Sequence, residues 1–180
     1  MHFRLNLLSK TSQFKSKWLS SRNLFSGAKR GEFAQAAPVL GNQYDQDPFL
    51  ISSLKHEIPR ELFDSQIEPD LREFGHQVAT NIHALSLECE RTQPIVRTYD
   101  AWGNRVDQLI VSEAWSKMKM ISAHEGLIAI AYDRSKYSVY SRVYQMAKLY
   151  LYGPSSGLYG CPLAMTDGAA KTIEVRQFSN

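Results

Sequence analysis

Apolar residues recur every three or four positions over much of this 180-residue chain, and that spacing predicts a mainly α-helical fold. The clearest stripe predicts a helix of about six turns that begins at Glu68-Pro69 and ends before Pro94. Its members are Ile67, Leu71, Phe74, Val78, Ile82, Leu85 and Cys89.

Caps and shorter stripes predict further helices. Asp47-Pro48 has the form of an N-cap followed by a first-turn proline, and Ser112 has the form of another N-cap. The expected elements are, in chain order, an extended lead-in over 31–45, a short helix over 48–55, a short turn or helix from 58, the long helix, and helices over 112–132, 137–152 and about 157–174.

The segment between the long helix and residue 112 has a different pattern. Strand-forming residues at Thr98-Tyr99 and from Arg105 to Ile110 flank a polar turn from Asp100 to Asn104. The pattern predicts a small hairpin-like excursion near residues 98–110, not a larger sheet.

Basic residues are concentrated at the start of the chain. Residues 1–30 hold seven of the 21 lysines and arginines and no acidic residue, so the remainder has 14 basic and 18 acidic side chains and a net charge of −4. Apolar residues from Leu5 to Leu19 are spaced so that a helix would separate them from the basic groups. This composition is typical of a mitochondrial transit peptide, here over residues 1–31, although a basic tail on a cytoplasmic protein would share it.

The rest of the composition excludes several classes of protein. No apolar run approaches the ~20 residues that span a bilayer. The negative charge of residues 31–180 disfavours a large nucleic-acid surface. Cys89 and Cys161 lie far apart without metal-ligand spacing, which favours reduced, partly buried thiols.

Histidines offer two candidate sites, and neither is favoured. His76 and His83 are seven residues apart on the predicted long helix and face similarly, but ligand pairs on a helix are spaced by three or four residues. His124 and Glu125 could be drawn as an acid–base pair, but adjacent helical residues point about 100° apart. No catalytic, cofactor-binding or metal-ligating residue is therefore assigned.

Glycine, serine and tyrosine patterns also favour structural roles. Gly153, Gly157 and Gly160 fit no nucleotide-binding fingerprint, and helix termination and close packing explain them better. Ser155 and Ser156 lack the nucleophile-elbow pattern. A third group of residues consists of Tyr137, Tyr140 and Tyr144, interleaved with Lys136, Arg142 and Lys148. The tyrosines could stack nucleic-acid bases while the basic residues hold phosphates, or the tyrosines could form one packed face of a helix. Packing is favoured.

The polar turn, a later segment and the lead-in carry a family resemblance. The run Tyr99-Asp100-Ala101-Trp102-Gly103-Asn104-Arg105-Val106-Asp107, followed by Ala114-Trp115, resembles the N-terminal region of acyl-CoA dehydrogenase-like flavoproteins of the adaptive-response type, commonly called AidB-like. Cys161-Pro162-Leu163-Ala164-Met165-Thr166, followed by Gly168-Ala169-Ala170, is similar to a helix of that family, and Asn42, Tyr44 and Asp47 fit its lead-in.

The resemblance covers about residues 35–174 and implies an N-terminal helical domain over 32–174 with a short tail over 175–180. In the family, FAD lies between a central β-domain and a C-terminal four-helix bundle, a carboxylate removes the α-proton of an acyl-CoA, and flavin N5 takes the β-hydride. The β-domain, the later flavin motif and the base have no match here. Met165–Ala170 resembles a degraded flavin motif, but its position after Cys161-Pro162 assigns it to packing.

The expected function is therefore that of an N-terminal domain or truncated form of a flavin-dependent acyl-CoA dehydrogenase-like protein, inactive alone. Acyl-CoA and FAD would be partners only in a full-length context. The alternative is a standalone helical interaction or regulatory module that pairs with a full-length flavoprotein, and a homo-oligomer is the other assembly left open.

Overall fold

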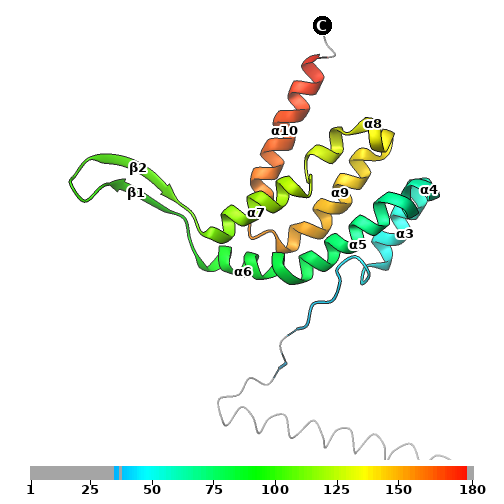
Figure 1. The fold of residues 1–180 in the computed structure, drawn as a ribbon, viewed down its shortest axis with the longest axis horizontal. Coiled ribbons are helices and arrows are strands. Elements are labelled where there is room, and N and C mark those ends of the chain that lie inside the picture. Colours follow the sequence, from blue (N-terminus) through cyan, green and yellow to red (C-terminus); the bar gives the residue numbers. More distant parts are fainter. Residues whose placement is uncertain (1–34, 37, 178–180) are drawn as a thin grey trace, which may run out of the picture. The chain divides into compact units, whose positions relative to one another are not determined.

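The computed structural model describes residues 35, 36 and 38–177, and the compact unit that carries the elements below begins at Leu40 (Figure 1). The predicted transit peptide lies outside the described residues. The elements are the helices α3 (Pro48–Glu57), α4 (Arg60–Leu62), α5 (Glu68–Gln77), α6 (His83–Arg91), α7 (Glu113–His124), α8 (Arg134–Tyr137), α9 (Ser141–Tyr152) and α10 (Gly160–Gln177), and the strands β1 (Ile95–Tyr99) and β2 (Arg105–Ile110). The prediction of a mainly helical fold with one hairpin is confirmed.

The long helix is longer than its apolar stripe predicts. Helical structure is continuous from Arg60 to Arg91, because a π-helical turn over Phe63–Ile67 joins α4 to α5 and a second over Val78–Ile82 joins α5 to α6. The first of these turns directly precedes Glu68-Pro69. Proline cannot donate to the carbonyl four residues back, so a helix can continue through Pro69 where the hydrogen-bonding pattern has already changed.

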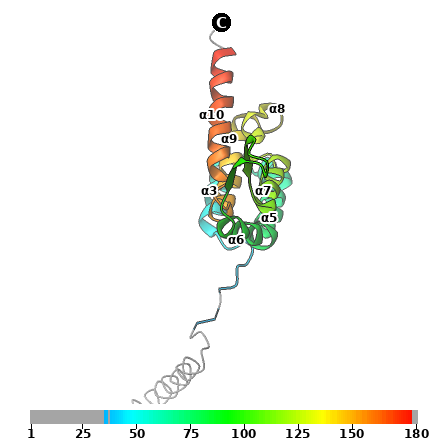
Figure 2. The same cartoon turned by 90° about the vertical axis from the view of Figure 1, so that its left-hand side faces the viewer.

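The core lies where the long helix packs against α7 and α9, which lie beside it in Figure 1; Figure 2 shows α5, α6 and α7 nearly end-on. Five members of the predicted stripe are buried there, whereas Leu85 and Cys89 pack at its margin. Burial of such side chains contributes about 1.5–3 kcal/mol each before the loss of conformational entropy is counted. The buried stripe members are Ile67, Leu71, Phe74, Val78 and Ile82.

The lead-in is more structured than predicted. Residues 43–46 form a turn, and Tyr44 is fully buried. A glycine in the middle of α5 makes this possible, because a Cβ at Gly75 would lie 2.7 Å from the backbone nitrogen of Tyr44. Asn42 completes the docking by donating to the carbonyl of Arg72. Asp47 caps α3 as predicted, accepting a hydrogen bond from Leu50 N at 2.8 Å.

The hairpin begins three residues earlier than its predicted start and extends away from the helices (Figure 1). One residue of β1 faces two of β2 between the pairs Arg97–Gln108 and Tyr99–Arg105, so β2 contains a bulge. Asp107 occupies that bulge with φ of +43°, a left-handed conformation that aspartate tolerates better than most residues.

The helices after the hairpin have different bounds from those predicted. The helix capped by Ser112 ends at His124, because Gly126 adopts φ of +61° and reverses the chain before the 3-10 turn over Ala129–Tyr132. The helix predicted over 137–152 begins at Ser141. The last helix begins at Gly160 rather than near 157 and continues to Gln177.

Candidate functional site

A buried ion cluster joins three segments that are distant in the sequence. Lys148 on α9 is 2% exposed, and its Nζ lies 2.8 Å from Glu125 Oε2 and 2.9 Å from Asp70 Oδ2. The ammonium group also lies 4.8 Å from the centroid of the Phe74 ring, and Tyr144 donates a hydrogen bond to Asp70. We call Asp70, Glu125, Tyr144 and Lys148 the lysine cluster. It ties α5, the turn after α7, and α9 together.

The lysine cluster has one more acid than base, and its tyrosine stays protonated. Burial and the hydrogen bond to Asp70 raise the pKa of Tyr144 well above its usual value, so the phenol keeps its proton. His124 Nδ1 lies 3.5 Å from Glu125 Oε1, closer than the sequence predicts, although the backbone of Glu125 still follows the helix and donates to the carbonyl of Ile121. The other oxygen of Glu125 binds Lys148, so this carboxylate serves as a counter-ion.

A second polar cluster joins α9 to α10. Arg142 Nη1 lies 2.9 Å and 2.7 Å from the two carboxylate oxygens of Asp167, and Tyr132 donates to Asp167 Oδ1 at 2.8 Å. Burial alone would raise the pKa of Asp167, but the hydrogen bonds from Arg142 and Tyr132 outweigh it and hold that pKa below its usual value. We call Tyr132, Arg142 and Asp167 the arginine cluster.

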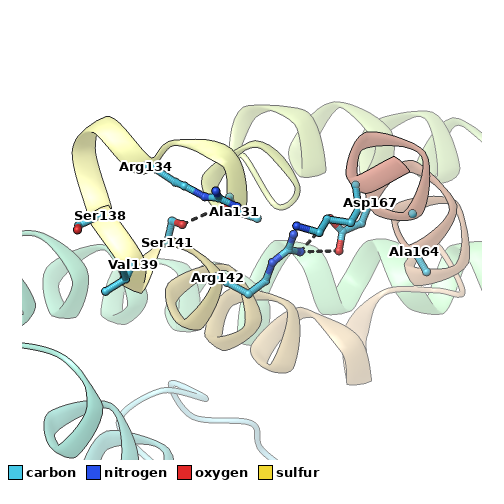
Figure 3. A pocket seen from close by; sticks show the side chains of 10 residues that line it. Ala131, Arg134, Ser138, Val139, Ser141, Arg142, Ala164 and Asp167 are labelled. Atoms are coloured by element: carbon cyan, nitrogen blue, oxygen red, sulfur yellow. Dashed lines mark hydrogen bonds and ion pairs between the residues drawn. The ribbon is translucent and has the colours of Figure 1, made fainter. Parts of the chain in front are cut away.

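An open pocket of about 970 Å³ adjoins the arginine cluster (Figure 3). Residues 131–142 form one side and α10 forms the other, and Figure 3 shows Arg142 reaching across to Asp167. Its lining combines small apolar groups with basic side chains at the rim. The lining residues are Ala131, Arg134, Ser138, Val139, Ser141, Arg142, Ala164, Asp167, Gly168 and Lys171.

The two histidines on the long helix form no site. His76 is exposed and His83 half-buried, on α5 and α6 respectively. Among residues 38–177 there is no group of three or more histidine, cysteine or acidic side chains that could hold a metal ion. The helices described for this chain include none long and apolar enough to cross a membrane.

The tyrosines on and before α9 form a packed face, as favoured by the sequence. Tyr137 and Tyr144 are buried with their rings edge to face, 4.9 Å apart between centroids. Two of the interleaved basic residues are bound to carboxylates within the fold, Arg142 to Asp167 and Lys148 to Glu125. Sequence reasoning missed the role of Lys148; the available signal was a lysine four residues after Tyr144, on the side of the helix predicted to be buried.

Close packing accounts for one of the three glycines near the start of α10. A Cβ at Gly157 would lie 2.8 Å from Cys89 Cβ and 3.1 Å from Ser86 Cα, so this glycine lets the loop rest on α6. A Cβ at Gly153 would have no atom within 4 Å, and a Cβ at Gly160 would lie at ordinary van der Waals distance from Ser156 Oγ. Cys89 is half-buried and Cys161 exposed, and both are free thiols.

The segment resembling a flavin motif is helical. Residues 165–170 lie inside α10, where their backbone groups belong to the helix. Thr166 donates to the carbonyl of Pro162, and Asp167 is held by Arg142 and Tyr132. Asp167 thus connects this segment to Tyr132 and α9, whereas Met165 and Thr166 are exposed.

Comparison with known families matches residues 35–178 to the model for the adaptive response protein AidB N-terminal domain. The chain belongs to this AidB N-terminal domain family. The family expected from the polar turn and the Cys161-Pro162 segment is therefore confirmed.

Individual relatives of this AidB N-terminal domain are much longer. This chain is 43% identical over 149 residues to acyl-CoA dehydrogenase family member 11 of Caenorhabditis elegans, and the match covers 83% of this chain and 24% of that protein. A crystal structure of C. elegans ACDH-11 in complex with C11-CoA matches with a TM-score of 0.76 at 42% identity, over 81% of this chain and 24% of that one. A structure titled Bd2924 apo-form matches with a TM-score of 0.75 at 40% identity, over 80% of this chain and 28% of that one. This chain therefore spans about a quarter of these relatives.

Proposed function

We propose that this chain acts as the N-terminal helical domain of a flavin-dependent acyl-CoA dehydrogenase-like protein and helps to enclose the acyl-CoA when the rest of such a protein is present. The observation that carries the proposal is the match of residues 35–178 to the AidB N-terminal domain family. It is supported by the similarity to ACDH-11, whose structure holds C11-CoA.

The open pocket beside α10 is the part of the domain that suits an acyl-CoA. Ala131, Val139 and Ala164 offer an apolar wall for an acyl chain, and Arg134 and Lys171 offer positive charge at the rim for phosphate groups. Glu174 binds both rim cations, which leaves a net charge of +1 on these three groups. The pocket is open on one side, as expected of a site that a second domain completes.

We infer that the segment resembling a flavin motif does not hold a flavin. The segment that resembles a flavin motif is part of α10, and its one carboxylate, Asp167, is already bound by Arg142 and Tyr132. No step of the family reaction is therefore assigned to residues of this chain. We expect the chain alone to lack dehydrogenase activity, because the reaction needs an electron acceptor held opposite a base.

Titration of the purified 180-residue chain with C11-CoA tests this proposal. We expect calorimetry to show only weak binding, because the open pocket lacks the domain that would complete it, and we expect no acyl-CoA-dependent dye reduction even when FAD is added. Val139→Asp, on the pocket wall, should weaken binding at least several-fold, whereas Val106→Asp, on the hairpin, should not; both valines are exposed, so neither change disturbs the core. Undetectable C11-CoA binding would overturn the pocket assignment, and dye reduction by the chain would overturn the inactive role.

A second function, an interaction module that pairs with a full-length flavoprotein, is supported by the uncovered apolar side chains of α10. Met165 and Ile173 are both more than half exposed. Large exposed apolar surfaces on a domain are typical of interfaces. Co-expression with a tagged full-length relative separates the two roles: recovery of this chain in a defined complex supports the module, and its absence from the purified relative contradicts it.

A further inference from the structure

The side of α10 that faces the rest of the domain changes from apolar to polar along the helix. Leu163 is buried, and the next positions on the same side are the half-buried Asp167, Ala170 and Glu174. Beyond Leu163 this side therefore presents one methyl group and two carboxylates. Because there is little apolar burial to fix it, the later part of α10 depends on particular polar pairs for its position.

Two such pairs hold α10, and they differ in strength. Asp167 is bound through both carboxylate oxygens by Arg142 and also accepts a hydrogen bond from Tyr132. Further along the helix, Arg134 Nη2 lies 2.8 Å from Glu174 Oε1, and the side chain of Arg134 is more than half exposed. A single exposed ion pair contributes little to stability and is screened by salt. The attachment at Asp167 is therefore firm and the one at Glu174 is weak.

Gly168 lies directly after the firm attachment and before the weak one. A Cβ there would have no atom within 4 Å, so close packing does not explain this glycine. Glycine inside a helix weakens it, because its backbone has more freedom than that of any other residue. Thr172 Oγ1 also donates to the carbonyl of Gly168 at 2.9 Å, a contact that often bends helices. These features indicate a flexible point at Gly168.

The open pocket beside α10 depends on where the residues after Gly168 lie. Lys171 lines the pocket from this part of α10, and Arg134 and Val139 line it from the opposite side. The Arg134–Glu174 pair joins these two sides. The C-terminal end of α10 projects past the other helices (Figures 1 and 2). A swing of residues 169–177 about Gly168 would therefore change the width of the pocket.

The weak pair can open without leaving its carboxylate unpaired. Glu174 Oε2 lies 2.6 Å from Lys171 Nζ, within the same helix, whereas Arg134 comes from the other side of the pocket. An anion that takes Arg134 therefore leaves Glu174 with Lys171. A phosphate group is a suitable competitor, because arginine binds phosphate through two parallel hydrogen bonds.

We propose that residues 169–177 form a hinged wall of the open pocket, held in place by the Arg134–Glu174 pair and released when a phosphate group of the ligand binds Arg134. The hinge and the pair are properties of the chain itself. The release by a ligand rests on the proposed function, which supplies an acyl-CoA as the source of the phosphate group. Release lets the wall move away from Arg134 and widens the pocket as the ligand enters.

Distances between pairs of nitroxide labels, measured by double electron–electron resonance, test the hinge. The background carries Cys89→Ala and Cys161→Ala, which remove both native thiols. One pair is placed at Met146→Cys, exposed on α9, and Arg176→Cys, exposed after the hinge. Residues 169–177 form an arm of about 14 Å, so a kink of about 20° displaces its end by about 5 Å.

Glu174→Gln should lengthen or broaden the 146–176 distance by about 5 Å, because it removes the charge that holds Arg134. It should leave a 146–165 pair unchanged, since Met165 lies before the hinge. Glu113→Gln removes the charge of an exposed pair on α7 and should change neither distance. An unchanged 146–176 distance in Glu174→Gln would overturn the proposal, and so would equal changes in both label pairs.

Addition of C11-CoA to the labelled chain tests the release, with calorimetry on the same samples to report binding. We expect bound C11-CoA to change the 146–176 distance as Glu174→Gln does. Binding with an unchanged distance would overturn the release and leave the proposed function standing. Undetectable binding would overturn the release together with the pocket assignment, whereas the Glu174→Gln comparison decides the hinge without any ligand.

Discussion

Lys148 Nζ lies 2.8 Å from Glu125 Oε2, and this contact joins α9 to the turn that ends α7, 23 residues earlier. The lysine is almost fully buried, and Asp70 from α5 supplies a second carboxylate. Three helical segments therefore meet at one buried cation. Buried ion pairs are costly to form but more costly to break, because removal of one partner leaves the other charge uncompensated.

Replacement of Lys148 by methionine should destabilise the domain strongly. Glu125 would remain largely buried without its cation, and we expect the free energy of unfolding to fall by about 3–5 kcal/mol in a urea titration. Lys117→Met removes a lysine from an exposed pair with Glu113 and should leave the free energy of unfolding nearly unchanged. Equal effects of the two substitutions would show that the lysine cluster is not a structural centre.

The same substitution at two glycines should have opposite effects. Gly75→Ala places a Cβ 2.7 Å from Tyr44 N, where only backbone movement can relieve the clash, and we expect a loss of about 1–3 kcal/mol. At Gly168, in α10, no atom lies within 4 Å of the new Cβ, and alanine should stabilise the helix by about 0.5–1 kcal/mol. Thermal unfolding of both variants measures the difference in stability. A Gly75→Ala variant as stable as the unmodified chain would contradict the packing of Tyr44 against α5.

The arginine cluster should make the stability of the domain depend on pH in the acidic range. Because the pKa of Asp167 is lower in the folded chain than its usual 3.8, the ionised carboxylate favours the folded state above that value, and its contribution disappears as the pH falls through the folded pKa. Between about pH 5 and pH 2, Asp167→Asn should therefore lose less stability than the unmodified chain. Urea midpoints measured across this range provide the comparison, and parallel curves would exclude a role for Asp167.

We propose that residues 1–31 direct the chain to mitochondria, on the basis of their seven basic residues, the absence of acidic residues and the spaced apolar positions. A fusion of residues 1–35 to a fluorescent protein should co-localise with a mitochondrial dye. A matched fusion in which Arg4, Lys10, Lys15 and Lys17 are replaced by glutamine should stay diffuse. Cytoplasmic fluorescence of the first fusion would favour the basic-tail interpretation.

Local patterns predicted the helical class, the caps and the turn of the hairpin, because those features depend on residues close together in the sequence. Asp47 and Ser112 cap helices as predicted, and Asp100 accepts hydrogen bonds from Trp102 N and Asn104 N within its own turn. Errors occurred where a helix end depended on one backbone reversal, as at Gly126, or where π-turns let a helix pass a proline, as at Pro69. The spacing of apolar residues indicates neither a backbone reversal nor a π-turn.

The sequence by itself determined the family, the helical class and the approximate order of the elements. Only the tertiary structure decided which polar residues meet. Asp70 and Glu125 carry no local signal of a shared partner, since they are brought to Lys148 by the packing of α5, α7 and α9. Likewise, the pairing of Arg142 with Asp167 depends on how α10 lies against α9. Contacts between distant segments follow from packing in three dimensions, which a one-dimensional pattern does not contain.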